Sequence, residues 1–331
     1  MKHFFIMNPA AGKGTRFHDL IDEIHKVCDR RGIYYAVHVT ERIGEATEFV
    51  KKMCQNSGEP MRFYACGGDG TIKEVASGLV GFEHAELGII PMGTGNDFVR
   101  NFEHNEQLFN IDAQLDGETR KIDLIKYNNK YAINVINTGF DCEVAKQVAV
   151  NRRSVFLPSK LAYTTGILQK ITKFDTAIVN GKISFDNMIH KGDKFQACVF
   201  ANGRYYGGGY KAAPASNFDD GLLDCCVIDK IPLTVFVGIL SDYKAGKHLF
   251  NKKAPEILAY RKCQKAELAF YHPTDISVDG EIERIQGKVS FSIVKDAVTL
   301  SLPKACQPIP VEPAVAKAAK KFNSRKNIYN V

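Results

Sequence analysis

Apolar and polar residues alternate along the first hundred positions in a way that predicts strands and helices in turn. Lys2–Met7 and Met61–Cys66 are apolar and rich in β-forming residues, as buried strands are. Over Phe17–Val27, apolar residues recur every three or four positions, which predicts one buried helix face. The expected series is strand Lys2–Met7, helix Phe17–Val27, strand Ile33–Val39, helix Ala46–Met53, strand Met61–Cys66, helix Thr71–Leu79 and strand Leu87–Pro91. Such alternation predicts a parallel sheet covered by helices on both faces.

The pattern changes from about Ile122, where short β-type runs follow one another with turn residues between them. These runs are Tyr131–Asn137, Lys182–Phe185, Phe195–Asn202, Leu222–Ile228, Ala266–Tyr271, Ile276–Asp279, Lys288–Val294 and Val298–Leu302. Only 159–171 is typical of a helix among them, so an antiparallel sandwich is expected. We therefore expect an α/β domain with a parallel sheet over 1–122 and an all-β sandwich over 123–304. The remaining segment, 305–331, is expected to pack back on the first domain.

Composition limits the location of the protein. Of its 331 residues, 45% are hydrophobic and 24% are charged, as in folded soluble domains. The longest uncharged apolar run, 231–241, is well short of the roughly 18–20 residues that a membrane helix needs. The apolar stretch Phe4–Met7 is also too short for a secretory signal, so a cytoplasmic protein is expected. Nine cysteines without Cys-x-x-Cys spacing predict reduced thiols in the core.

The net charge of +7 is unevenly distributed. The last segment, 311–331, holds five basic residues and one acidic residue, so it could contact acidic lipid or stay solvated. Arg152, Arg153 and Lys160 flank an apolar stretch, 155–157, which suits either an anionic membrane surface or a solvated loop. No nucleic-acid motif accompanies these charges, and we expect no nucleic-acid partner.

Three glycine-containing loops each follow a predicted strand, and such loops gather at the edge of an α/β sheet that binds ligands. Asn8–Gly14 has small residues before a helix, which suits an anion, although the spacing is not that of a Walker A loop and the loop taken alone favours an ordinary turn. In Gly67–Thr71, Asp69 would repel a polyphosphate unless Mg²⁺ bridges them. Asp69 could instead cap the next helix. Pro91–Phe98 forms a third loop of the same kind.

These loops resemble the motifs of one family. Asn8-Pro9 with Gly12, Gly67–Thr71 and Gly93–Phe98 are similar to the motifs of the diacylglycerol kinase catalytic family, which includes soluble bacterial diacylglycerol kinases, sphingosine kinases and ceramide kinases. The second motif alone is shared with NAD kinases and, loosely, with phosphofructokinases. The resemblance continues with Tyr206–Gly209, Ala213-Pro214, Asp220–Asp224 and Val278–Glu281 in the order of the family. It covers nearly the whole chain and implies the fold shared by NAD kinases and diacylglycerol kinases.

The resemblance implies roles for individual residues. The residues that would contact ATP are Asn8, Pro9, Ala10, Ala11, Gly12, Thr40, Gly67, Gly68, Asp69, Gly70, Thr71, Ile72, Lys73, Glu74, Thr94 and Asn96. Glu281 would accept a proton, while Asp69 and Asp97 would hold the catalytic Mg²⁺ and its water. A structural Mg²⁺ would bind Asn217, Asp220 and the carbonyl of Leu222. The family has aspartate where Asn217 stands, and losing that charge weakens such a site.

The implied activity is that of an ATP- and Mg²⁺-dependent lipid kinase, with the nucleotide between the domains. A lipid alcohol is a poor nucleophile, so a carboxylate such as Glu281 is suited to accept its proton, and Mg²⁺ to neutralise charge on the phosphates. The expected acceptor is diacylglycerol, giving phosphatidic acid, for an enzyme peripheral to the inner face of the membrane. Relatives suggest a homodimer. The alternatives are an NAD kinase-like enzyme, a kinase of a sphingoid, ceramide or polyprenol alcohol, and a nucleotide-binding regulator without catalysis.

Overall fold

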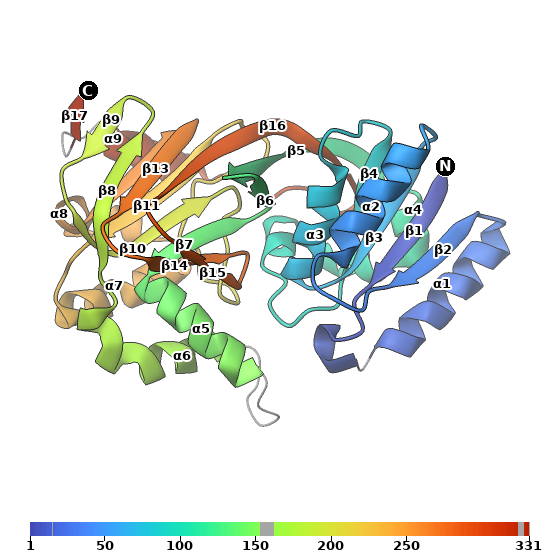
Figure 1. The fold of residues 1–331 in the computed structure, drawn as a ribbon, viewed down its shortest axis with the longest axis horizontal. Helices are drawn as coiled ribbons and strands as arrows, with labels where there is room; N and C mark the ends of the chain where they lie inside the picture. The colour runs from blue at the N-terminus through green and yellow to red at the C-terminus, as the bar shows by residue number, and fades with distance from the viewer. Residues whose placement is uncertain (15, 153–161, 324–327, 331) are drawn as a thin grey trace. The chain divides into compact units, whose positions relative to one another are not determined.

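The computed structural model describes residues 1–14, 16–152, 162–323 and 328–330 of the chain (Figure 1). They form two compact units. Unit 1 comprises Met1–Leu124 and Lys295–Ile309, and unit 2 comprises Ile125–Val294 and Pro310–Val331. Each unit has its own sheet system and is described by itself.

Unit 1 is built on a parallel sheet, as the alternating pattern predicts. Its strands are β1 (Lys2–Met7), β2 (Tyr35–Val39), β3 (Met61–Gly67) and β4 (Ala85–Pro91), in the order β2-β1-β3-β4. The end of β16 (Lys288–Leu302) adds a further parallel strand, since Thr299 pairs with Glu86 of β4. The loops after β1, β3 and β4 therefore share one edge of this sheet.

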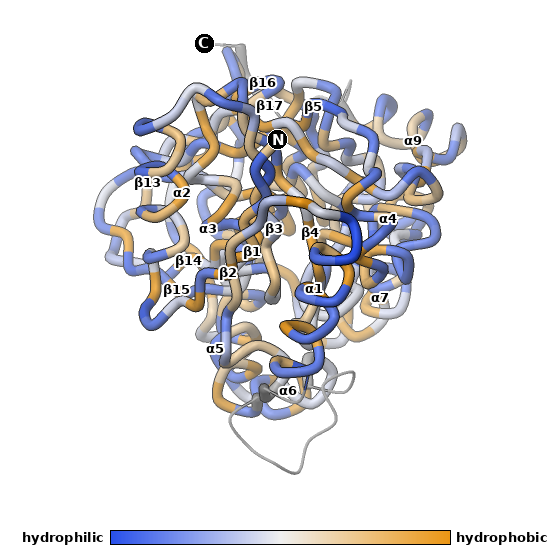
Figure 2. Tube along the Cα trace, turned by 90° about the vertical axis from the view of Figure 1, so that its right-hand side faces the viewer, coloured by the Kyte–Doolittle hydropathy of each residue, from blue (hydrophilic) through white to orange (hydrophobic). Residues whose placement is uncertain are grey.

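Helices cover both faces of this sheet. Successive side chains of a strand point to opposite faces, and the strands of this sheet place apolar side chains on both. The helices are α1 (Phe17–Arg31), α2 (Glu45–Asn56), α3 (Asp69–Leu79) and α4 (Ile111–Leu115). Phe5 and Tyr64 pack with α1 and α4, and Figure 2 shows α1 with both hydrophilic and hydrophobic turns. On the other face, the ring of Phe4 stacks on that of Phe63, and its centroid lies 6.2 Å from the ring centroid of Phe49 in α2.

Unit 2 contains the expected antiparallel sandwich. One sheet has the order β12-β11-β10-β7-β14-β15, and the other has the order β16-β13-β8-β9-β17. The strands are β7 (Val135–Gly139), β8 (Val179–Phe185), β9 (Met188–His190), β10 (Lys194–Ala201), β11 (Leu223–Asp229), β12 (Leu258–Cys263), β13 (Lys265–Phe270), β14 (Thr274–Val278), β15 (Glu281–Ile285) and β17 (Ile328–Asn330), preceded by β5 (Glu118–Tyr127) and β6 (Lys130–Ala132). The rings of Phe200 and Phe291 stack inside the sandwich, with their centroids 4.1 Å apart.

Helices bury the outer face of the first sheet of unit 2. They are α5 (Phe140–Arg152), α6 (Ala162–Lys170), α7 (Leu233–Ala245), α8 (Ala254–Ile257) and α9 (Pro313–Asn323). Val199 and Cys226 point to this helical layer, whereas Cys198 and Val227 point into the sandwich. The sequence pattern locates the sandwich and the helix near 159–171, but it does not predict α5 or α7.

The domain boundaries need correction. The first boundary lies at Leu124 and Ile125 rather than at 122 and 123, and 295–304 belongs to unit 1 because the end of β16 pairs with β4. Of the C-terminal segment, 305–309 belongs to unit 1 as expected, but the part that follows does not. Helix α9 instead joins the outer core of unit 2 through Val315, Ala319 and Phe322, which recur at helical spacing.

Two expectations from composition can be checked on the structure. All nine cysteines are buried and free of disulfide bonds, as predicted. Among the helices of the described residues, none is both long and apolar enough to cross a bilayer. The apolar run 231–241 forms most of α7, with Phe236 and Ile239 buried. The basic and apolar patch around 153–161 lies outside the described residues.

Candidate functional site

Three glycine loops meet at the carboxyl edge of the unit 1 sheet. The side-chain amide of Asn8, at the end of β1, donates to Oγ1 of Thr71 at 3.2 Å. The carbonyl of Gly67, at the end of β3, accepts the N–H groups of Met92 at 2.8 Å and Gly93 at 3.2 Å. These bonds hold the first and third loops against the second.

The glycines permit this close approach because a side chain would collide with the neighbouring loop or, at Gly67, with the same loop. A Cβ on Gly93 would lie 2.5 Å from Cα of Gly68, and a Cβ on Gly67 would lie 2.2 Å from Oγ1 of Thr71. Gly12 has a φ of +58°, and a Cβ there would lie 2.5 Å from the carbonyl oxygen of Met92. The edge is therefore lined mainly by backbone, which suits a bound polyphosphate.

Asp69 links the second loop to the third. Its Oδ2 accepts the N–H of Asp97 and its Oδ1 accepts the N–H of Phe98, each at 3.1 Å. Asp69 is also the first residue of α3, where the helix dipole stabilises a negative charge. A carboxylate at the start of a helix thus fixes the shape of the loop that follows β4, although it makes no capping bond within its own helix.

Two side chains near the end of the third loop form hydrogen bonds with the backbone of the same loop. Asn96 has a left-handed backbone with a φ of 49°, and its amide donates to the carbonyl of Gly93 at 2.8 Å. Oδ1 of Asn96 has no hydrogen-bond partner among the described residues. Arg100, which the sequence analysis does not identify, donates to the carbonyl of Gly95 at 3.2 Å and pairs with Oδ1 of Asp97 at 3.2 Å. Its position three residues after Asp97 is the signal that could have identified it.

This edge has the donors that a magnesium–phosphate complex requires. The first N–H groups of α3 have no acceptor within the helix, which makes its N-terminus suited to an anion. Asp69 and Asp97 bring two carboxylates to this edge, and Mg²⁺ is commonly held by one or two carboxylates together with phosphate oxygens. No cluster of three or more His, Cys, Asp or Glu in the described residues could hold a metal alone. The residues therefore fit a metal ion that arrives with a nucleotide.

The other expected nucleotide contacts differ in accessibility. Thr40 donates its N–H to the carbonyl of Met7 at 2.9 Å, so it lies beside the end of β1. Both carboxylate oxygens of Glu74 instead accept N–H groups at the N-terminus of α2, from Gly44 at 2.9 Å and Ala46 at 3.3 Å. Pro9, Ala10 and Thr94 are exposed, Ala11 and Gly70 are half-buried, and Ile72 and Lys73 are buried.

Glu281 belongs to unit 2, where it starts β15 after a tight hairpin. Val278 pairs with Glu281, and the two turn residues Asp279 and Gly280 have φ values of 47° and 91°. The Asp279 carboxylate accepts the N–H groups of Ile133, Asn134 and Val135 at 2.9, 3.1 and 2.9 Å. The sequence analysis includes Asp279 only within the motif Val278–Glu281 and the run Ile276–Asp279, whereas these three bonds fix the hairpin that carries Glu281.

The loop expected to hold a structural Mg²⁺ also lies in unit 2. Oδ1 of Asp220 accepts the N–H of Leu222 at 3.0 Å, and Oδ2 of Asp220 lies 2.7 Å from Nζ of Lys262. The same ammonium lies 2.9 Å from Oδ2 of Asp224. Because Asn217 supplies no charge and a lysine already neutralises Asp220, the residues present do not fit the expected metal ion.

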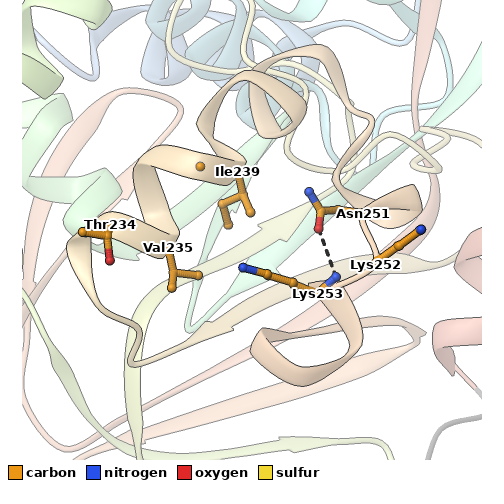
Figure 3. A pocket seen from close by; sticks show the side chains of 7 residues that line it. Thr234, Val235, Ile239, Asn251, Lys252 and Lys253 are labelled. Atoms are coloured by element: carbon orange, nitrogen blue, oxygen red, sulfur yellow. Dashed lines mark hydrogen bonds between the residues drawn. The ribbon is translucent and has the colours of Figure 1, made fainter.

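A pocket of about 530 Å³ opens beside α7 on unit 2 (Figure 3). Thr234, Val235 and Ile239 come from α7, and Asn251–Lys253 follow the short helix η6 (His248–Phe250). The side-chain oxygen of Asn251 accepts the backbone N–H of Lys253 at 3.0 Å. The lining combines aliphatic groups with two ammonium groups, and sequence reasoning identified none of these residues.

Comparison with known proteins assigns a family to each part of the chain. Residues 2–127 match the diacylglycerol kinase catalytic domain, and residues 134–300 match the YegS C-terminal NAD kinase beta sandwich-like domain. The second match covers half of the chain. It contains Glu281 and the 217–222 loop, whereas the first contains all three glycine loops.

Relatives cover both units. A protein of Staphylococcus epidermidis named diacylglycerol kinase is 29% identical over 280 residues, which are 83% of this chain and 84% of that protein. A diacylglycerol kinase of Staphylococcus aureus is 28% identical over the same shares. The crystal structure of a diacylglycerol kinase from Bacillus anthracis covers 95% of this chain and 98% of its own, with a TM-score of 0.65 and 21% identity, and so supports the fold. The chain belongs to the family of the YegS C-terminal NAD kinase beta sandwich-like domain, carries a diacylglycerol kinase catalytic domain before it, and is a diacylglycerol kinase-like lipid kinase.

Proposed function

We propose that the protein transfers the γ-phosphoryl group of ATP to the free hydroxyl of diacylglycerol, giving phosphatidic acid. The observation that carries the proposal is the link between three loops at one sheet edge, in which Asp69 accepts the N–H groups of Asp97 and Phe98. The choice of acceptor is supported by relatives named diacylglycerol kinase that span 83% of the chain.

The residues at this edge would bind and orient the nucleotide. The N-terminus of α3 and the backbone around Gly67 and Gly93 would hold phosphate oxygens, with Thr71 kept in place by Asn8. Asp69 and Asp97 would hold Mg²⁺, which when bound neutralises the charge that develops on the phosphates. Arg100 keeps the third loop in shape through Gly95.

We propose that Glu281 accepts the proton of the acceptor hydroxyl. An alcohol attacks phosphorus more readily when a carboxylate accepts its proton as the new bond forms. The hairpin that carries Glu281 is fixed by Asp279 and its three backbone donors, so the carboxylate starts from a rigid element. This assignment is supported by the similarity of Val278–Glu281 to the family motif.

The test is phosphoryl transfer from labelled ATP with Mg²⁺ in mixed micelles. Diacylglycerol, ceramide, sphingosine and a polyprenol are offered separately, with NAD in a parallel reaction. Labelled phosphatidic acid is expected. Product on another lipid would overturn the acceptor but keep the reaction, and product on NAD alone would place the enzyme with the NAD kinases. ATP binding without any product would favour a regulator without catalysis.

We also propose that unit 2 contacts an anionic bilayer through the α7 surface, defined as Val237, Phe250, Lys252 and Lys253 with the pocket between α7 and η6. Val237 and Phe250 are 53% and 51% exposed, and Lys252 and Lys253, which follow Phe250 in the chain, are exposed as well. Apolar side chains next to basic ones suit the interface of an anionic membrane, where each basic residue contributes roughly 1 kcal/mol.

Vesicle binding tests this surface without relying on catalysis. The double variant Lys252→Glu/Lys253→Glu should bind phosphatidylglycerol vesicles at least about tenfold more weakly than the wild type. The control, Lys182→Glu/Lys265→Glu, changes the same charge at exposed positions on β8 and β13. If both double variants lose vesicle binding equally, or if neither loses it, the α7 surface is not the contact. A short-chain diacylglycerol that needs no vesicle checks that phosphoryl transfer survives.

A further inference from the structure

Two side chains of β12 anchor the loop 213–222 to the first sheet of unit 2. The hydroxyl of Tyr260 accepts the N–H of Ala215 at 3.2 Å and donates to Oδ1 of Asp224 at 2.5 Å. Nζ of Lys262 lies 2.7 Å from Asp220 and 2.9 Å from Asp224. Tyr260 and Lys262 are two positions apart on one strand, so both point to the side on which the loop lies.

The position of Lys262 is determined by strand register. Lys262 of β12 pairs directly with Asp224 of β11, which brings their side chains together across the sheet. Asp224 is fully buried and Lys262 is 24% exposed at its side chain. A buried carboxylate without a cation nearby is strongly destabilising, so Asp224 requires a positive group at this position.

A third contact fixes the same loop from another side. Nε of Arg204, a buried residue, donates to the carbonyl of Ser216 at 2.9 Å. The loop is thus held at Ala215, Ser216 and Asp220 by groups of the protein itself. This set of anchors does what a structural metal ion does, which is to tie a loop rich in polar groups to the domain.

A divalent ion would compete with Lys262 for the same oxygen. Mg²⁺ requires several oxygen ligands at about 2.0–2.1 Å, with carboxylates among them. Oδ1 of Asp220 already accepts the N–H of Leu222, and its Oδ2 contacts the ammonium. A metal ion bound to Asp220 would therefore lie next to a second positive charge, which is unfavourable in a partly buried place.

We propose that the ammonium of Lys262 is a built-in cation that replaces the structural metal ion of this loop, so that the loop is ordered without any divalent ion. The geometry agrees, because Nζ of Lys262 lies 2.7 Å from Oδ2 of Asp220 and 2.9 Å from Oδ2 of Asp224, where a bound cation would contact both carboxylates. Asn217 is consistent with this arrangement, because a third carboxylate is not needed.

The first experiment compares thermal unfolding of the wild type in EDTA and in MgCl₂, without nucleotide. Equal melting temperatures are expected. If Mg²⁺ raises the melting temperature and Asp220→Asn abolishes that rise, the loop binds a metal ion and the proposal is wrong. If a rise persists unchanged in Asp220→Asn, the ion acts elsewhere and the proposal stands.

The second experiment removes the built-in cation. Lys262→Met should lower the melting temperature on the order of 5 °C, because it leaves the buried Asp224 carboxylate without a cation beside it. Mn²⁺ should restore part of this loss and should bind to the variant more tightly than to the wild type. The control Lys265→Met changes an exposed lysine that forms no ion pair among the described residues, and it should behave as the wild type does. Equal Mn²⁺ affinity in Lys262→Met and the wild type would overturn the proposal.

The aspartate of the family provides the sharpest comparison. Asn217→Asp alone should not create Mn²⁺ binding, because Lys262 still neutralises Asp220. Asn217→Asp combined with Lys262→Met should bind Mn²⁺ more tightly than either single variant. If Lys262→Met does not fold, Lys262→Arg keeps the charge and should retain metal-independent stability. Strong Mn²⁺ binding by Asn217→Asp with Lys262 intact would show that the ammonium does not occupy the cation position.

Discussion

Replacing Asp69 by asparagine separates two roles that this carboxylate could have. Both oxygens now accept backbone N–H groups, from Asp97 and from Phe98. An asparagine side chain offers one oxygen, and its NH₂ group would face the second N–H. The variant therefore loses the charge assistance of one bond and leaves one donor without an acceptor.

The size of the effect follows from these two bonds. A hydrogen bond to a charged group contributes about 1.5–3 kcal/mol, and a half-buried site reduces that figure. We expect Asp69→Asn to lower the free energy of unfolding by about 2 kcal/mol and turnover by at least about 10²-fold. Urea unfolding measures the first quantity, and phosphoryl transfer with a Mg²⁺ titration measures the second.

Asp97→Asn is the matched control, because Asp97 contributes only its backbone N–H to this link. It should reduce turnover while changing stability less than Asp69→Asn, apart from the loss of the ion pair with Arg100. If Asp69→Asn is as stable as the wild type but inactive, Asp69 acts on the metal rather than on the loop. If it is both stable and active, the link is not needed and the reasoning is refuted.

Three further predictions test other parts of the molecule. Glu281→Gln should leave ATP affinity unchanged and lower turnover about 10²-fold, and near-normal turnover would exclude Glu281 as the proton acceptor. Gly93→Ala should weaken ATP binding at least about tenfold, measured by calorimetry, because the new Cβ would lie 2.5 Å from Cα of Gly68; unchanged affinity would show that the loops can separate freely. Burial lowers the pKa of His248 to about 4, below its usual value of about 6.5, so its neutral form stabilises the fold above pH 6.5, and this contribution is lost as the pH falls toward 4. Between pH 7.5 and 5 the wild type should lose about 2 kcal/mol more in urea unfolding than His248→Gln, and parallel pH profiles would contradict this.

The sequence predicts unit 1 well because each of its elements has a clear period. The strand Lys2–Met7 is found at its predicted bounds, and α1 begins at Phe17 as expected. Unit 2 is harder for two physical reasons. The run 231–241 has too few polar positions to show a helical period, although it forms most of α7. The strand β12 carries Arg261 and Lys262, charged residues that are rare inside a sheet, and Arg261 is only 2% exposed.

The partners of the site residues could not be read from the sequence. Asp69 is bonded to the backbone of Asp97 and Phe98, and backbone donors leave no trace in residue identity. Lys262 lies far along the chain from Asp220, and only the pairing of β11 with β12 brings them together. Sequence reasoning therefore locates the loops that carry chemistry, but it does not show which of their charges are already neutralised.

Three carboxylates that a motif search would assign to metal binding or to a turn have structural partners in this fold. Asp69 holds the third loop, Asp279 holds the backbone of Ile133–Val135, and Asp220 is paired with Lys262. Loss of activity after their substitution is thus not sufficient to show that they touch a metal ion or a substrate. A catalytic role requires that activity falls without a matching fall in stability. Both the activity and the free energy of unfolding must therefore be measured for each variant. The hairpin that carries Glu281 is held by the three bonds of Asp279, and Glu281→Gln leaves those three bonds in place.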